Sequence, residues 1–465
     1  MIENRSPWLA QLNRARPVIP LAADTAAEVA VVGGGIAGAV TAYFALRDTT
    51  NRVILLEADK VAHGATGHNA GQLTSYFERP FESLVEEYGL PLAVEGQRAV
   101  ESAWGLLEEI VAEAGLRTPV YRFTGYAGCS SFEQLLAFLE ENRDRVLGGL
   151  PAETVLIARE SGWSEELPLA YKDLYSVVPQ EDLLALLETG DHKYKASIAS
   201  PKGCMNSALF TEELVGYLLA AHPGRFELFE RSPVKKVTLK ETGATLEIAT
   251  GHRVEAKRVV LCTNGFEQFS VENESGSDID TKFHHLVQGR IGYMAGYLES
   301  LNAPPTAISY FPKDTKPSGD PTGEAYFYFT RRPHDEAEDG SARNLVCAGG
   351  PEQVLPNQAD YSRKDHCRED IRESLDEFLR STYRHFPDPG TEYAFCWHGL
   401  MGYTPGGVRR IGIEPCNPVL LYNLGCNGVG ILPSIYGGKR IARILSGEKL
   451  ERSIFDPEDQ RCILI

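Results

Sequence analysis

The sequence predicts an α/β protein of two or three domains. Its 465 residues are more than one ordinary domain holds. Near the N-terminus, a β-branched run, a glycine cluster, an apolar helical pattern and a second apolar run follow one another in the order of a βαβ unit. Residues 226–262 instead alternate like antiparallel strands, with a turn at Gly243. Parallel and antiparallel patterns in one chain favour an α/β domain joined to an α+β domain.

Apolar runs and glycines define the N-terminal unit. Glu28–Val32 is a β-branched strand, Gly33–Gly35 interrupts it, Ile36–Val40 resumes as a helix, and Arg52–Glu57 is a second strand that ends in an acid. Strand, tight turn, helix and strand within about 30 residues form the unit with which Rossmann-type folds bind dinucleotides.

The turn in this unit matches the dinucleotide fingerprint G-x-G-x-x-G. Gly33 permits the tight turn, Gly35 lets a pyrophosphate approach the backbone, and Gly38 lets the helix pack on the strand. The helix N-terminus then faces the phosphates. Glu57 lies 19 residues after Gly38, where it can accept hydrogen bonds from ribose hydroxyls. The predicted site comprises Gly33, Gly35, Ile36, Ala37, Gly38 and Glu57.

Helical periodicity recurs through the middle of the chain. The predicted helices are 92–115, 132–146, 181–188, 211–221 and 363–383, and the predicted strands of a second sheet are 285–297 and 325–330. We expect Thr211 to cap the fourth helix, with Glu212 and Glu213 at its positive end. Residues 271–281 and 312–323 are polar or rich in Pro, Gly and Asp, and predict surface loops.

Three further segments resemble the D-amino acid oxidase-like superfamily of FAD-dependent oxidoreductases. They are the glycine-rich loop Gly64–Leu73, the penultimate motif Trp397–Gly407, and the strand-glycine-helix element that starts with Leu421–Ile431. Their order, spanning nearly the whole chain, makes the resemblance specific. It implies FAD as the cofactor, with contacts from Ala65, Thr66, His68, Asn69, Gly71, Gln72, Leu73, Val234, Thr263, Asn264, Gly265, Gly428, Val429, Gly430 and Ile431.

The resemblance also implies how the domains are divided. A discontinuous Rossmann-type FAD-binding domain would comprise residues 25–80, 200–268 and 396–450. A substrate domain of the α+β type, with a mixed or antiparallel sheet, would be inserted as residues 81–199 and 269–395. Residues 1–24 and 451–465 would be terminal extensions.

Within this superfamily, the chain looks similar to the gamma-glutamylputrescine oxidase, glycine oxidase and sarcosine-dimethylglycine dehydrogenase branches. The implied reaction is oxidation of the C–N bond of an amine or amino acid, with hydride transfer to flavin N5, hydrolysis of the imine, and O2 as electron acceptor giving H2O2. One alternative is a dehydrogenase that passes electrons to a quinone or an electron-transfer protein. Another is a flavin-bound protein without catalysis that serves in assembly.

Two departures from the superfamily bear on the cofactor and the substrate. His68 stands where many members have arginine, and in the dimethylglycine and sarcosine dehydrogenase branch a histidine in a similar loop bonds covalently to the flavin. A covalent bond from His68 to FAD is therefore one hypothesis. Trp397 and His398 stand where an arginine would fix a substrate carboxylate, so Arg290 or Arg331 could serve instead, or the substrate could be an amine.

The catalytic residues are not identified by any motif. Tyr326 and Tyr328, two apart on a predicted strand, point to the same face and could position an amine, or could be ordinary core aromatics. The candidates are therefore Tyr326, Tyr328, Arg290 and His398.

Composition excludes several other classes of protein. Asp and Glu outnumber Lys and Arg by 64 to 46, which disfavours nucleic acid as a partner. No apolar run is long enough to span a membrane, and no leader is recognisable, so we expect a cytoplasmic protein without a membrane partner. The nine cysteines form no C-x-x-C pair, so we expect no metal site. The sequence predicts no oligomeric state.

Overall fold

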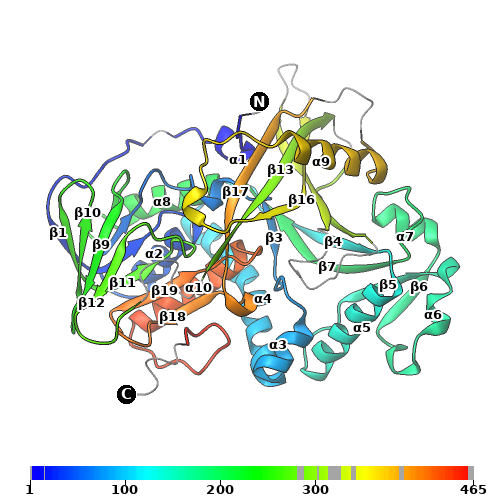
Figure 1. The fold of residues 1–465 in the computed structure, drawn as a ribbon, viewed down its shortest axis with the longest axis horizontal. Helices are drawn as coiled ribbons and strands as arrows, with labels where there is room; N and C mark the ends of the chain where they lie inside the picture. The colour runs from blue at the N-terminus through cyan, green and yellow to red at the C-terminus, as the bar shows by residue number, and fades with distance from the viewer. Residues whose placement is uncertain are drawn as a thin grey trace.

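The computed structural model describes residues 3–14, 16–279, 287–300, 303–312, 326–336, 342–386 and 392–458. Two large mixed sheets lie side by side, and helices cover their faces (Figure 1). The predicted α/β class is confirmed. No helix among the described residues has the length and apolar character needed to cross a bilayer.

The first sheet has a parallel centre formed by the predicted βαβ unit. Strand β1 (Thr25–Val32) lies between β2 (Val53–Leu56) and β11 (Arg253–Leu261), and both pairings are parallel. Strands β8 (Phe226–Phe229) and β19 (Leu420–Leu424) extend it at either side. All four residues of β2 are buried, as expected for a parallel strand covered on both faces.

An antiparallel extension completes this sheet. Strands β9 (Val234–Leu239) and β10 (Ala244–Ile248) form the predicted hairpin, closed where the Lys240 amide donates to the Gly243 carbonyl at 2.8 Å. Strand β18 (Arg410–Ile413) pairs with β19. The loop prediction for residues 271–281 is wrong at its start, because β12 (Ser270–Asn273) pairs in parallel with β9.

Helices α2 (Ile36–Asp48), α4 (Leu90–Ala114), α8 (Ser207–Ala221) and α10 (Ile431–Leu445) pack together beside the first sheet. Helices α2 and α10 approach closely, since a Cβ on Gly438 would lie 2.9 Å from the backbone of Val40. The cap prediction for α8 is wrong. Asn206 caps this helix through its side chain, and Thr211 lies inside it with its hydroxyl bonded to the Ser207 carbonyl.

The second sheet is mainly antiparallel. Its order is β17 (Phe395–Tyr403), β13 (Gln288–Ser300), β16 (Ala342–Val354), β15 (Phe327–Glu336), β14 (Thr306–Phe311), β4 (Tyr121–Cys129), β7 (Ala196–Cys204), β5 (Thr154–Ala158) and β6 (Tyr175–Val178), with β3 (Gln72–Thr74) beside β7. The predicted strands 285–297 and 325–330 correspond to β13 and β15. Residues 280–286 and 313–325 lie outside the described part.

Helices that flank this sheet are α5 (Phe132–Leu147), α6 (Trp163–Glu166), α7 (Gln180–Leu186) and α9 (Glu369–Thr382) (Figure 1). Helix α3 (Phe81–Tyr88) packs on α4 and α5. Helix α5 begins with a capping box between Ser131 and Gln134. The helices predicted at 92–115, 132–146, 181–188 and 363–383 are thus confirmed, with ends that differ by up to six residues.

The N-terminal segment packs against both sheets. Its short helix α1 (Pro7–Ala10) contains Trp8, which is fully buried. The backbone of Arg5 forms an isolated antiparallel β-bridge with Cys396 of β17. Strand β12 belongs to the first sheet, whereas β3, β7 and β17 belong to the second.

Candidate active site

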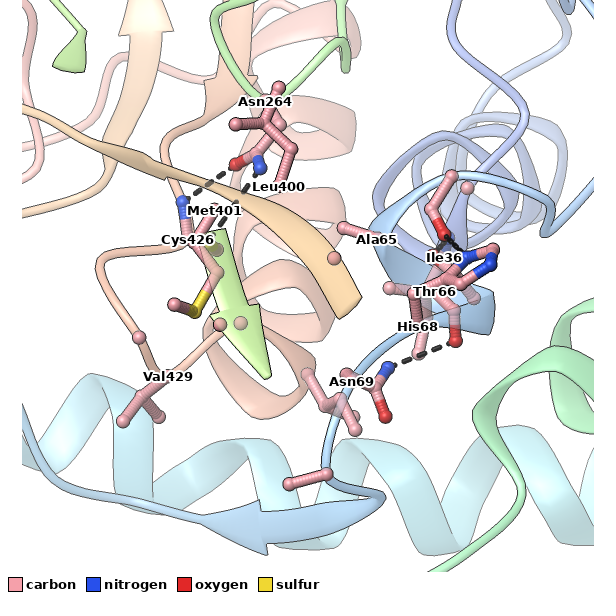
Figure 2. Close-up of a pocket in the computed structure, with 18 of the residues that line it drawn as sticks. Ile36, Ala65, Thr66, His68, Asn69, Asn264, Leu400, Met401, Cys426 and Val429 are labelled. Carbon is pink, nitrogen blue, oxygen red and sulfur yellow. Dashed lines mark hydrogen bonds between the residues drawn. The ribbon is translucent and has the colours of Figure 1, made fainter. Parts of the chain in front are cut away.

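One cavity of about 340 Å³ runs between the two sheets. Figure 2 shows its two walls: Ile36, Ala65 and His68 on one side, and Asn264 and Val429 on the other. The cavity brings together most of the residues that the sequence singled out. Those that line it are Gly33, Gly35, Ile36, Ala37, Glu57, Ala65, Thr66, His68, Asn69, Gly71, Gln72, Thr263, Asn264, Tyr326, Tyr328, Gly428, Val429, Gly430 and Ile431.

The turn between β1 and α2 forms one end of this cavity. Gly33 has a φ of +109°, and a Cβ there would lie 2.6 Å from the Cys262 carbonyl oxygen, so only glycine fits. Gly38 lines no part of the cavity, because it packs directly on the Gly33 carbonyl. Gly35 is the N-cap of α2 and provides no side-chain cap. The start of α2 therefore presents backbone amides to the cavity, as an anion site requires.

Glu57 closes the same end from β2. Its carboxylate accepts from the amides of Gly34 at 2.7 Å and Asp59 at 2.8 Å. Burial raises the pKa of Glu57, and the two amides oppose that shift. A carboxylate has about four acceptor positions, so capacity remains for hydroxyl donors from the cavity.

The loop of residues 64–72 forms a neighbouring wall and is held by hydrogen bonds within the loop and from three other segments. Asn69 donates to the carbonyl of Thr66 at 2.9 Å and accepts from the amide of Gly71 at 2.7 Å. The backbone carbonyl of Asn69 accepts from the indole N–H groups of both Trp8 (2.5 Å) and Trp397 (3.2 Å). Thr66 accepts from the amide of Ile36 at 2.9 Å, which ties the loop to α2 (Figure 2).

His68 lies in this loop with its ring in the cavity wall. Its Nδ1 lies 2.9 Å from the Gly64 carbonyl oxygen, which can only accept a hydrogen bond, so Nδ1 carries the proton. In the neutral ring, Nε2 is then unprotonated. Burial lowers the pKa of His68 to about 4, which keeps the ring neutral at physiological pH.

The opposite wall is the turn from β19 into α10. The side chain of Asn264 accepts from the Cys426 amide at 2.8 Å, and that of Asn427 accepts from the Thr404 amide at 2.7 Å (Figure 2 draws the first). Helix α10 begins after Gly430 without a side-chain cap. A second helix N-terminus therefore meets the cavity, where it would stabilise negative charge.

The other end of the cavity is polar and aromatic. Tyr326 and Tyr328 both line it, with ring centroids 5.7 Å apart. The Tyr326 hydroxyl donates to Glu78 at 3.1 Å, and Glu352 also lines the wall. Glu78 and Glu352 stand in no motif, and the contact between Tyr326 and Glu78 joins residues 248 apart in sequence, so the sequence offered no signal for them.

Three candidates lie outside the cavity. Arg290 stacks over the Tyr403 ring, 4.2 Å from its centroid, in an adjoining surface cleft. Arg331 is almost fully buried and pairs with Glu188 at 2.6 Å. The His398 ring is held by the Asp365 carbonyl at 3.0 Å.

Four of the expected cofactor contacts also do not line the cavity. They are Gly38, Leu73, Val234 and Gly265. Leu73 and Val234 are buried in the hydrophobic core, and Gly265 packs on the side chain of Val287.

The fold and the cavity define a dinucleotide-binding protein: a glycine turn, an acid at the end of the second strand, and two uncapped helix N-termini around one enclosed space. The model of the DAO family, FAD dependent oxidoreductases, matches residues 28–444. The chain belongs to this family, and it is an FAD-dependent oxidoreductase.

Curated relatives match only part of the chain. A segment of 88 residues is 33% identical to gamma-glutamylputrescine oxidoreductase of Escherichia coli, and one of 90 residues is 32% identical to the putative Rieske 2Fe-2S iron-sulfur protein YhfW of Bacillus subtilis. These matches cover 19% and 18% of this chain, and about a fifth of each relative.

Solved structures match almost the whole chain in fold. Glycine oxidase from Geobacillus kaustophilus has a TM-score of 0.64 at 15% identity, over 93% of this chain and 98% of that chain. L-proline dehydrogenase from P. horikoshii has a TM-score of 0.63 at 13% identity, over 92% and 95%. At these identities the likeness is one of fold.

Replacing Glu57 with alanine should weaken FAD binding without unfolding the protein. The change removes any charge-assisted bonds to ribose hydroxyls, each of which contributes about 1.5–3 kcal/mol. We therefore expect the dissociation constant for FAD to rise roughly 10- to 100-fold for one such bond, measured by titrating the apoprotein and following flavin fluorescence. Glu57→Gln retains one acceptor oxygen and should lose less affinity. Equal affinity in all three proteins would mean that the ribose is bound elsewhere.

Proposed function

We propose that this protein oxidises the C–N bond of an amine or amino acid and passes the electrons to O2. The observation that supports this most directly is the continuity of the cavity. Its glycine and helix-terminus end has the features of a dinucleotide site, and the same space extends to a cluster of tyrosines and carboxylates. The partial likeness to gamma-glutamylputrescine oxidoreductase also favours a nitrogen-containing donor.

In the proposed reaction, the substrate loses two electrons and two protons and becomes an imine. Bound FAD supplies the hydride acceptor for this oxidation. Water then converts the imine to a carbonyl compound and releases ammonia or an amine, while O2 takes up the two electrons and two protons as H2O2. The residues of this chain orient the donor and exclude bulk water, and no side-chain nucleophile is required.

We propose the following contacts with FAD. The start of α2 would hold the pyrophosphate, Glu57 would bind the ribose, residues 64–72 would line the flavin, and the α10 N-terminus would stabilise negative charge on it. We further propose that His68 contacts FAD as a neutral ring without a covalent bond. Acid precipitation of the purified protein should then leave the yellow colour in the supernatant. Colour in the pellet, lost in His68→Ala, would instead demonstrate a histidyl linkage.

Two measurements test the function itself. Anaerobic mixing with a broad panel of amines and amino acids should bleach the flavin absorbance, and air should restore it within the time of turnover, with H2O2 formed. Slow reoxidation by air, but rapid reoxidation by a quinone, would favour a dehydrogenase. A flavin that no compound in the panel bleaches would indicate a protein without this catalysis.

A further inference from the structure

We propose that the substrate is a diamine or longer polyamine, whose second nitrogen stays protonated and is bound between Glu78 and Glu352. This inference rests on the proposed function and specifies its substrate class. It follows from the composition of the tyrosine end of the cavity, where carboxylates and aromatic rings are present. The arginines of the described lining, Arg363 and Arg409, are both engaged with other groups.

Two carboxylates reach the cavity from different parts of the fold. Glu78 lies between β3 and α3 and packs against the turn from β19 into α10. A Cβ on Gly428 in that turn would lie 2.6 Å from the Glu78 Cγ. Glu352 lies in β16 and accepts from the Tyr403 hydroxyl at 3.3 Å. Oxygens from two separate walls can share the three donors of one ammonium group.

Aromatic rings complete a site for a cation. Tyr76, Tyr326 and Tyr328 line the same end of the cavity. The face of a tyrosine attracts an ammonium group, and the attraction is strongest where water is excluded. Carboxylates and ring faces together favour a positively charged group over a neutral or negative one.

An α-carboxylate finds no clamp here. Among the described residues that line the cavity, the arginines are Arg363 and Arg409. Arg363 pairs with Asp59 at 3.0 Å, close to the Glu57 end. Arg409 donates to the side chain of Asn423 at 2.7 Å and to backbone carbonyls beside it. A carboxylate bound at the tyrosine end would lie near Glu78 and Glu352, where like charges repel.

Two cations lie behind these walls. Arg290 stacks on Tyr403 in the adjoining cleft, 3.5 Å from Glu352. Lys202 is buried in β7 and donates to Ser309 at 3.3 Å, with Ser309 between it and the cavity. Both moderate the negative charge of the carboxylates, but neither lines the space that the substrate would occupy.

The first test compares four compounds with the holoenzyme under anaerobic conditions: 1,4-diaminobutane, 1-aminobutane, 4-aminobutanoate and glycine. We expect the second-order rate constant for flavin reduction to be highest for the diamine, about tenfold above that for the monoamine, and lowest for the two compounds that carry a carboxylate. Faster reduction by 4-aminobutanoate or glycine would overturn the diamine proposal and leave the proposed function standing. Failure of all compounds in this and the broader panel would overturn both.

A second test separates binding from turnover. Butyltrimethylammonium has no nitrogen lone pair and cannot be oxidised, so calorimetry reports its binding to the holoenzyme alone. We expect Glu352→Gln to weaken that binding about tenfold and to remove the preference for the diamine over 1-aminobutane. The matched control is Glu108→Gln, an exposed residue of α4, which should change neither. Unaltered binding in Glu352→Gln would contradict the proposal.

The pH dependence gives a third test. Burial, with the charge of Glu352, raises the pKa of Glu78 to about 7, while Tyr326, Lys202 and Arg290 oppose the shift. Below that pH Glu78 gains a proton and no longer attracts a cation. Binding of butyltrimethylammonium, which does not titrate, should therefore weaken as pH falls from 8 to 6, and Glu78→Gln should flatten the profile. A profile that is flat in the unaltered protein would contradict the role of Glu78.

Discussion

Replacing Gly35 with valine is expected to abolish FAD retention. A Cβ at this position would lie 2.9 Å from the Thr66 hydroxyl oxygen, which accepts from the Ile36 amide. A branched side chain would displace Thr66 and cover the amides at the start of α2. Overpacking costs about 1–3 kcal/mol, and each lost contact to a phosphate a further 1.5–3 kcal/mol or so. The affinity for FAD should thus fall about 100-fold or more.

The measurement is the ratio of flavin to protein absorbance after purification and after reconstitution with excess FAD. Circular dichroism must show that the variant is folded, since Gly35 also starts a buried helix. Gly216→Ala in α8 is the matched control, because no atom lies within 4 Å of its added Cβ. It should retain FAD and gain roughly 0.5–1 kcal/mol in stability. Full FAD occupancy in Gly35→Val would refute the assignment of this turn to the pyrophosphate.

Local signals explain why the dinucleotide end could be predicted from the sequence. The β1 to α2 turn, Glu57 and the turn before α10 each depend on glycines or an acid at fixed spacing from an apolar run, and all three line the cavity. Such features are set within a few residues of one another. Their chemistry is therefore visible before any tertiary contact is known.

The tyrosine end was only half predicted, because it depends on contacts between distant segments. Tyr326 and Tyr328 follow from strand alternation, but Glu78 becomes significant only when the fold brings it to Tyr326. By residue type, Arg331 could have held a substrate carboxylate, but in the structure it is paired with Glu188. Charge pairing of this kind has no local pattern.

Competing local signals account for the error at α8. Thr211 followed by two acids has the composition of a helix start. Asn206 lies five residues earlier, and its side chain accepts from two amides, at 3.1 Å from Ala208 and 3.0 Å from Leu209. Since Asn ranks above Thr as an N-cap, the helix begins there and Thr211 is enclosed within it.

Replacing Trp8 with alanine should strongly lower the stability of the protein. Trp8 lies in the N-terminal segment and is fully buried, with its ring edge-on to Trp397 at a centroid distance of 6.1 Å. A Cβ on Gly71 would lie 2.6 Å from the Trp8 ring, so the indole supports the loop of residues 64–72 directly. Truncation would leave a cavity behind this loop and remove one donor to the Asn69 carbonyl.

We expect the free energy of unfolding to fall by about 3–5 kcal/mol, measured by urea denaturation of the apoprotein so that FAD does not contribute. FAD affinity should fall as well, because the loop that lines the cavity loses its support. Trp163→Ala is the control: this tryptophan is half-buried in α6, 5.9 Å from the Phe132 ring, and lies away from the cavity lining. It should cost less stability and leave FAD affinity unchanged. If Trp8→Ala lowers stability but not FAD affinity, the N-terminal segment supports the fold alone; a loss of both shows that it also positions the cofactor loop.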